Sequence, residues 1–137
     1  MLVVDASAVA ELLLRRTAAA DVERHLAEHD MDLHAPHLLD VEVLSVLRRV
    51  VASGDARPAR AAAAIADLLD LRVERYPHDV LAPRIWQLRD NFSAYDASYL
   101  ALAESLGADG ATLLTADQRF ASAARARGCV EVLAVSG

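Results

Sequence analysis

Four acidic side chains stand where a parallel-sheet protein builds a catalytic or metal-binding site. Asp5 ends one short apolar run, and Asp117 closely follows another. Asp96 opens an apolar helical segment, and Glu42 lies in the first turns of a second one. Open α/β sheets bind ligands beyond the carboxyl ends of their strands, so we expect the four carboxylates to converge at that edge.

Such a group of carboxylates requires compensation of its charge. Two carboxylates ~5 Å apart repel each other by roughly 3 kcal/mol at an effective dielectric constant of about 20. The group therefore persists only if a cation neutralises it or if some of the acids hold a proton. Because oxygen ligands favour hard cations, the predicted ion is Mg²⁺, with Mn²⁺ as a substitute.

Three of the acids also have a purely structural explanation. Asp5 can cap the helix that follows it, and Asp96 can form a capping box with Ser93. Asp117 can simply favour the positive end of its helix, with Thr115 as the N-cap. Taken singly, each of these acids leaves the structural and the functional interpretation equally open.

Glu42 resists a structural explanation better than the other three. The residues three and four positions away are Leu38, Leu39, Ser45 and Val46, so no cation stands at helical ion-pair spacing. A glutamate on an apolar stripe needs a partner, because burying its charge alone is costly. We expect that partner to be a metal ion or an arginine from a distant part of the chain.

The segments that must position these acids alternate between strand and helix. Strands are predicted at 2–4, 33–35, 72–76, 112–114 and 130–133, and helices at 6–14, 18–28, 38–52, 58–69, 79–90, 95–106 and 117–127. Pro83 fits the first turn of the helix in which it lies. Strands alternating with helices predict an α/β fold with a parallel sheet.

Length and composition limit the class of protein. The 137 residues suit one domain spanning 1–137, without internal repeats or linkers. No apolar run reaches the ~20 residues of a membrane span, and the chain starts directly with a strand rather than a signal peptide. The single cysteine, Cys129, excludes an intramolecular disulfide and suits a cytoplasmic protein. We expect Cys129 to be a small buried residue near the last strand.

The charge is acidic, with a net value of −6, and all 14 basic residues are arginine. Nucleic-acid binders are normally basic, so this charge argues against that class unless a metal offsets the carboxylates locally. The planar arginine fork suits bidentate phosphate contacts, although genome composition explains the absence of lysine more readily. Arg89 and Arg119 are candidates for RNA phosphate contacts, and each is equally well explained as an ordinary surface arginine.

The surroundings of all four acids resemble the PIN-domain ribonucleases, and within them the VapC-type toxins. The similar stretches are 3–8, the helix that carries Glu42, 89–103 and 114–120. Together they cover essentially the whole chain, and the stretch from Tyr95 to Ala103 is the most specific part. The resemblance implies a PIN-like, three-layer α/β/α fold with about five parallel strands. It also implies a Mg²⁺-dependent endoribonuclease whose metal ligands match Asp5, Glu42, Asp96 and Asp117.

The resemblance further implies an RNA substrate, a homodimer and a cognate antitoxin that blocks the site. In this chemistry a metal-activated water attacks the phosphodiester and leaves a 5′-phosphate. Ser7 and Thr115 are candidates for holding metal-bound waters, and they can serve equally well as helix caps. Two alternatives remain: a PIN-like module that binds RNA or protein without cutting, and a DNA-directed nuclease.

An apolar groove for the antitoxin is a further hypothesis. Two predicted helices, 18–28 and 38–52, carry apolar residues, of which we expect some to form the core and the surplus to line a groove for an amphipathic antitoxin helix. The alternative is that all of these residues belong to the core. The residues in question are Val22, Leu26, Leu39, Val43 and Leu47.

Overall fold

A parallel sheet of five strands organises the chain in the computed structural model, which describes residues 1–136. The strands are β1 (Leu2–Val4), β2 (Leu33–Pro36), β3 (Val73–Tyr76), β4 (Thr112–Thr115) and β5 (Val132–Ala134). Their order across the sheet is β3-β2-β1-β4-β5, and every pairing is parallel. The most buried strand, β1, therefore lies at the centre.

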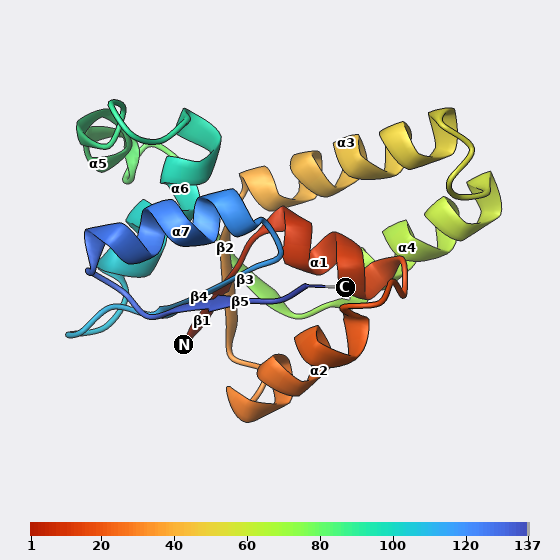
Figure 1. The fold of residues 1–137 in the computed structure, drawn as a ribbon, viewed down its shortest axis with the longest axis horizontal. Helices are drawn as coiled ribbons and strands as arrows, with labels where there is room; N and C mark the ends of the chain where they lie inside the picture. Colours follow the sequence, from red (N-terminus) through yellow and green to blue (C-terminus); the bar gives the residue numbers. More distant parts are fainter. Residues whose placement is uncertain (137) are drawn as a thin grey trace.

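Helices cover both faces of this sheet. They are α1 (Ala6–Leu13), α2 (Ala19–Glu28), α3 (Leu38–Ala52), α4 (Pro58–Asp70), α5 (Ala82–Gln87), α6 (Ala94–Ser105) and α7 (Gln118–Arg127). α1 packs against α2, α3 and α4, whereas α6 packs against α5 and the central strands. Right-handed crossovers put α1 to α4 on one face and α5 to α7 on the other. Figure 1 shows α3 and α4 at the right of the view and α5, α6 and α7 at the upper left. The predicted three-layer α/β/α fold is confirmed.

The strand order reverses direction beside the central strand. The chain moves outward from β1 to β2 and β3, crosses back over the sheet, and continues outward through β4 and β5. The connections that follow the neighbouring strands β1 and β4 therefore leave the sheet in opposite directions. Such a switch point opens a crevice at the carboxyl ends of the two strands. Asp5 directly follows β1, and Asp117 follows β4 after one residue.

Burial on both faces makes the centre of the fold rigid. The three residues of β1 are at most 1% exposed, as expected for a parallel strand with helices above and below. Residues 97–103 of α6 are buried without interruption. A helix enclosed in this way holds its first turn, which carries Asp96, in a defined place relative to β1.

The fold corrects three expectations about helix bounds and burial. The helix predicted at 79–90 spans only Ala82–Gln87, because the Asp79 side chain accepts a hydrogen bond from Val80 N and forms a turn before it. Pro83 does lie in its first turn. Cys129 is exposed, since the last strand begins at Val132 and leaves Cys129 in the preceding loop.

The third correction concerns the apolar residues assigned to a possible groove. All five belong to the buried core, so they provide no surface for a partner. They are Val22, Leu26, Leu39, Val43 and Leu47. None of the helices described for residues 1–136 has the length and apolar character that crossing a membrane requires.

Candidate active site

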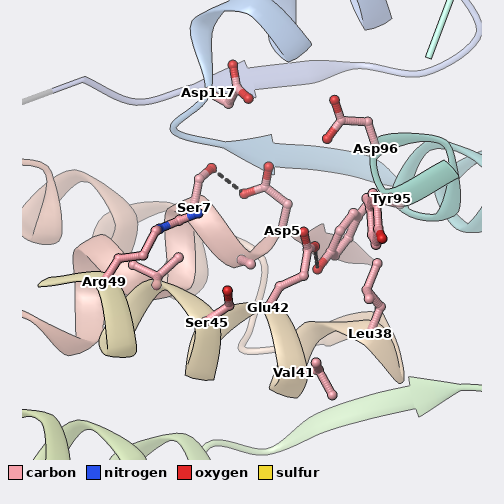
Figure 2. Close-up of a pocket in the computed structure, with 13 residues that line it drawn as sticks. Asp5, Ser7, Leu38, Val41, Glu42, Ser45, Arg49, Tyr95, Asp96 and Asp117 are labelled. Atoms are coloured by element: carbon pink, nitrogen blue, oxygen red, sulfur yellow. Dashed lines mark hydrogen bonds between the residues drawn. The ribbon is translucent and has the colours of Figure 1, made fainter. Parts of the chain in front are cut away.

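All four predicted acids line one cavity of about 500 Å³ at the switch point of the sheet. Each comes from a different segment: Asp5 from the end of β1, Glu42 from the second turn of α3, Asp96 from the first turn of α6, and Asp117 from the residue before α7. Figure 2 shows Asp96 and Asp117 on one side of the cavity, Glu42 on the opposite side and Asp5 between them. The topology therefore brings together residues separated by more than a hundred positions in the chain.

Asp5 is the most buried of the four acids, at 5% exposure. Its Oδ1 accepts hydrogen bonds from Ser7 Oγ at 2.7 Å and from Ala8 N at 3.0 Å, so it also caps α1. Its Oδ2 accepts a hydrogen bond from Thr115 Oγ1 at 2.5 Å. Burial raises the pKa of Asp5 to about 6, even though these hydrogen bonds act in the opposite direction. The charge of Asp96 adds to the rise.

Ser7 and Thr115 connect the two sides of the switch point. Their hydroxyl oxygens lie 3.2 Å apart, Ser7 Oγ accepts a hydrogen bond from Ala116 N, and Thr115 Oγ1 accepts one from Asp117 N. Thr115 is therefore not the N-cap of α7. Asp117 itself is the N-cap, because its Oδ1 accepts hydrogen bonds from Arg119 N and Phe120 N, at 3.0 and 3.1 Å. Thr115 is the last residue of β4, and its hydroxyl donates to Asp5 at the end of the neighbouring strand β1.

Glu42 has a partner that the sequence did not reveal. Tyr99 Oη donates a hydrogen bond to Glu42 Oε1 at 2.7 Å, and Tyr99 is 2% exposed. Burial and the neighbouring carboxylate hold the pKa of Tyr99 well above its ordinary value, so the phenol remains a donor. Helical spacing within α3 gave no sign of this contact, because Tyr99 comes from α6, 57 positions away. The only available signal was a tyrosine one turn beyond Asp96.

Asp96 is the acid with the fewest contacts. Its backbone N–H donates to Ser93 Oγ at 3.2 Å, which confirms Ser93 as the helix cap. The capping box expected from the sequence is incomplete, because Ser93 N does not donate to the Asp96 carboxylate within residues 1–136. Within residues 1–136 its carboxylate makes no hydrogen bond or ion pair. Burial, together with the charges of Asp117 and Glu42, raises the pKa of Asp96 to about 6. Both of its oxygens are therefore available to a ligand.

Neither of the two arginines proposed for RNA contacts is among the residues that line the cavity. The Arg89 guanidinium stacks 4.5 Å from the centre of the Trp86 ring and donates to the Trp86 carbonyl at 3.0 Å. Arg119 follows the N-cap of α7 on the exposed surface. The cavity instead contains Arg49, together with Ser45 and Tyr95, none of which local sequence patterns indicated. Their positions on the cavity wall depend on how α3 and α6 pack, which no local pattern records.

The donor set of the cavity fits a hard divalent cation. Four carboxylates line it, no ion pair within residues 1–136 involves any of them, and two have pKa values raised to about 6. Carboxylate oxygens without nitrogen or sulfur donors suit Mg²⁺ and Mn²⁺. The side chains line the walls without converging: within residues 1–136 no three His, Cys, Asp or Glu side chains form a ready coordination shell. Mutual repulsion of the carboxylates favours such spacing.

Comparison with known proteins gives sequence matches over nearly the whole chain. A PIN-domain family model matches residues 2–126. The chain is 45% identical over 125 residues to ribonuclease VapC1 of Mycobacterium tuberculosis, a match that covers 88% of this chain and 89% of the relative. It is 41% identical over 133 residues to ribonuclease VapC9 of the same organism, covering 97% and 98% of the two chains.

Solved structures agree with the fold. The crystal structure of PAE2754 from Pyrobaculum aerophilum superposes with a TM-score of 0.66 at 24% identity, covering 96% of this chain and 82% of that one. Mycobacterium tuberculosis VapC20, a toxin that cleaves the sarcin–ricin loop, superposes with a TM-score of 0.68 at 20% identity, covering 90% and 95%. At these identities the likeness shows the shared architecture.

Proposed function

The chain belongs to the PIN-domain family, among the VapC ribonuclease toxins, and on this premise we propose that its carboxylate cavity is where it cuts RNA. Members of the family are endoribonucleases, and metal-dependent cleavage is typical of them. The observation that carries the proposal is the meeting of Asp5, Glu42, Asp96 and Asp117 in one cavity at the switch point.

The four carboxylates are the proposed ligands of Mg²⁺, with Mn²⁺ as a substitute. When bound, the cation stabilises charge on the phosphoryl oxygens and lowers the pKa of the attacking water. Ser7 and Thr115 hold the Asp5 carboxylate in one orientation through hydrogen bonds to both of its oxygens. Tyr99 does the same for Glu42. Asp96 and Asp117 each keep at least one oxygen free to face the substrate side.

Replacing Asp96 by Asn tests the assignment. Losing a partner of a metal ligand typically costs 10- to 100-fold in metal affinity or activity, so losing a ligand should cost more than ~100-fold. We expect Asp96→Asn to bind Mn²⁺ weakly, as measured by electron paramagnetic resonance, and to lose RNA cleavage while keeping its circular dichroism spectrum. Asp109→Asn, at an exposed position outside the cavity, is the matched control. Full cleavage by a folded Asp96→Asn protein would contradict the assignment.

The same preparation separates the alternative functions. RNA and DNA oligonucleotides of one sequence are incubated with the wild type in Mg²⁺ and in EDTA. A ribonuclease cuts only the RNA and only with the metal. Cleavage of both would indicate a nuclease without preference for ribose, and binding without cleavage would indicate a non-catalytic module.

A VapC-type toxin implies a VapB antitoxin as its partner. Because the cavity carries several negative charges, an inhibitor can block it with an arginine placed among the carboxylates. Co-expression with the product of the neighbouring reading frame tests this regulation. Co-purification and loss of RNA cleavage would support it. If neither that product nor another small protein binds, the toxin–antitoxin part of the proposal is wrong and the nuclease part stands.

A further inference from the structure

One wall of the cavity is a single face of α3. Glu42, Ser45, Val46 and Arg49 occupy positions i, i+3, i+4 and i+7, which fall on the same side of a helix, and all four line the cavity. At ~1.5 Å per residue, the backbone of Arg49 stands ~10 Å further along α3 than that of Glu42. Figure 2 shows the Arg49 side chain extending from α3 towards the part of the cavity where Ser7 lies.

Arg49 is the one cationic residue among the described residues that line this cavity. Three other arginines are held in ion pairs with acids: Arg24, Arg75 and Arg84. The Arg89 guanidinium stacks on the Trp86 ring and donates a hydrogen bond to the Trp86 carbonyl. Within residues 1–136 the guanidinium of Arg49 makes no hydrogen bond or ion pair, and the residue is exposed. Its five donors are therefore free to bind a ligand.

An RNA strand needs such a cation at this place. Every nucleotide carries a phosphate, and a strand held with one phosphate at the carboxylates brings the next phosphate to the cavity wall. A cation bound by the carboxylates offsets the charge of the phosphate that is cut. The adjacent phosphate still faces an excess of negative charge, which a guanidinium can balance with a bidentate contact.

We propose that Arg49, on the wall formed by α3, binds the RNA phosphate next to the one that is cut. This inference rests on the proposed function and extends it, because it gives the path of the RNA strand across the protein surface. The strand runs from the carboxylates along α3 to Arg49. Ser45, one turn before Arg49 on the same wall, lies within the same phosphate subsite.

The test measures RNA binding in the Asp96→Asn background, where cleavage does not deplete the substrate. Fluorescence anisotropy with a labelled single-stranded RNA is recorded in EDTA over a series of salt concentrations. Loss of one phosphate contact lowers the slope of log K against log salt by about 0.7 for a single strand. We expect Arg49→Ala to show that reduction and weaker binding. Arg49→Lys keeps the charge, so it should keep the slope while losing affinity with the planar fork.

Arg48→Ala is the matched control, because Arg48 is the adjacent exposed arginine and does not line the cavity. The inference is overturned if Arg49→Ala and Arg48→Ala bind alike, or if Arg49→Ala impairs only antitoxin binding. A parent protein that binds no RNA would overturn both the inference and the proposed function. If Asp96→Asn still cuts RNA while Arg49→Ala lowers the slope, the metal assignment alone is wrong.

Discussion

At the scale of single residues, burial of Asp5 dominates the electrostatics of the cavity. Its carboxylate accepts three hydrogen bonds, and burial still raises its pKa from 3.8 to about 6. One pKa unit corresponds to ~1.4 kcal/mol, so an ionised Asp5 costs on the order of 3 kcal/mol of stability at neutral pH. A bound cation removes that cost, which couples folding of the site to metal binding.

The raised pKa predicts a pH-dependent stability. A carboxyl whose folded pKa exceeds its unfolded value contributes fully below the unfolded value of 3.8, and the contribution is lost as the pH rises through about 6. Asp5→Asn cannot ionise at this position. Its free energy of unfolding, relative to that of the wild type in EDTA, should therefore rise by up to ~3 kcal/mol between pH 4 and pH 7. Urea denaturation at each pH measures the difference. Asp96→Asn should show a smaller gain, since Asp96 is only half-buried. A difference that is independent of pH would contradict the burial argument.

Tyr99 provides a second prediction at this scale, as the residue that positions Glu42. Tyr99→Phe keeps the buried ring and removes only the donor to Glu42 Oε1. We expect Mn²⁺ affinity to fall ~10-fold, as for other partners of metal ligands, with little change in the melting temperature. Tyr95→Phe is the matched control: Tyr95 also lines the cavity, and its hydroxyl makes no hydrogen bond within residues 1–136. Equal Mn²⁺ affinities for the two variants would rule out a positioning role.

At the scale of elements, each helix that delivers an acid is anchored close to that acid. Arg75 on β3 holds Asp40, in the first turn of α3, through two hydrogen bonds of 2.7 and 2.8 Å. A second hydrogen bond holds the start of α3: Leu38 N donates to His78 Nε2 at 3.1 Å. Asp40 therefore fixes the position of α3 and does not line the cavity. Glu42 lies two residues beyond this anchor.

The cap of α6 gives the prediction at this scale. Ser93→Ala removes the acceptor for Asp96 N and should cost ~1 kcal/mol in the free energy of unfolding. Because the next residues of α6 are buried, only its first turn should loosen, and cleavage should fall with it. Ser105→Ala, which removes a hydrogen bond to Leu102 O at the other end of α6, should leave cleavage unchanged. Urea denaturation and an RNA cleavage assay report the two effects, and equal cleavage by both variants would contradict the argument.

At the scale of the whole molecule, large apolar side chains are exposed beside the cavity. Val41 and Tyr95 line its rim, and they are 65% and 61% exposed. Val80 and Trp86, near α5, are 68% and 67% exposed. Ala94, the residue before Tyr95, lines the small apolar hollow that also contains Trp86, so the two exposed groups adjoin. An apolar surface of this kind is typical of a protein–protein interface.

A homodimer formed through this surface is the prediction at the scale of the molecule. Two-fold symmetry places the same surface on both partners, so one charged substitution enters the interface twice. We expect the wild type to sediment as a dimer and Trp86→Asp as a monomer in analytical ultracentrifugation. Leu69→Asp, at a position on α4 that is 74% exposed, should remain dimeric. A monomeric wild type would exclude the dimer. A dimeric Trp86→Asp would place the interface elsewhere.

The sequence by itself determined the features that depend on near neighbours in the chain. α3 and β1 have the bounds that periodicity and flanking residues predict, and the caps at Asp5 and Ser93 follow from hydrogen bonds over three residues. Alternating strands and helices were sufficient for a parallel α/β fold. The four acids could be nominated because parallel strands place their carboxyl ends at one edge whatever the detailed packing.

Only the tertiary structure decided how those acids are held and what faces them. The contact of Tyr99 with Glu42 spans 57 positions, and that of Thr115 with Asp5 spans 110. The presence of Arg49 in the cavity depends on how α3 packs on its neighbours. These contacts depend on which face each helix turns towards the sheet and on strand order, and both arise from burial summed over the whole core. Local hydrogen bonds and steric preferences act over three or four residues, so they carry no record of partners that far apart.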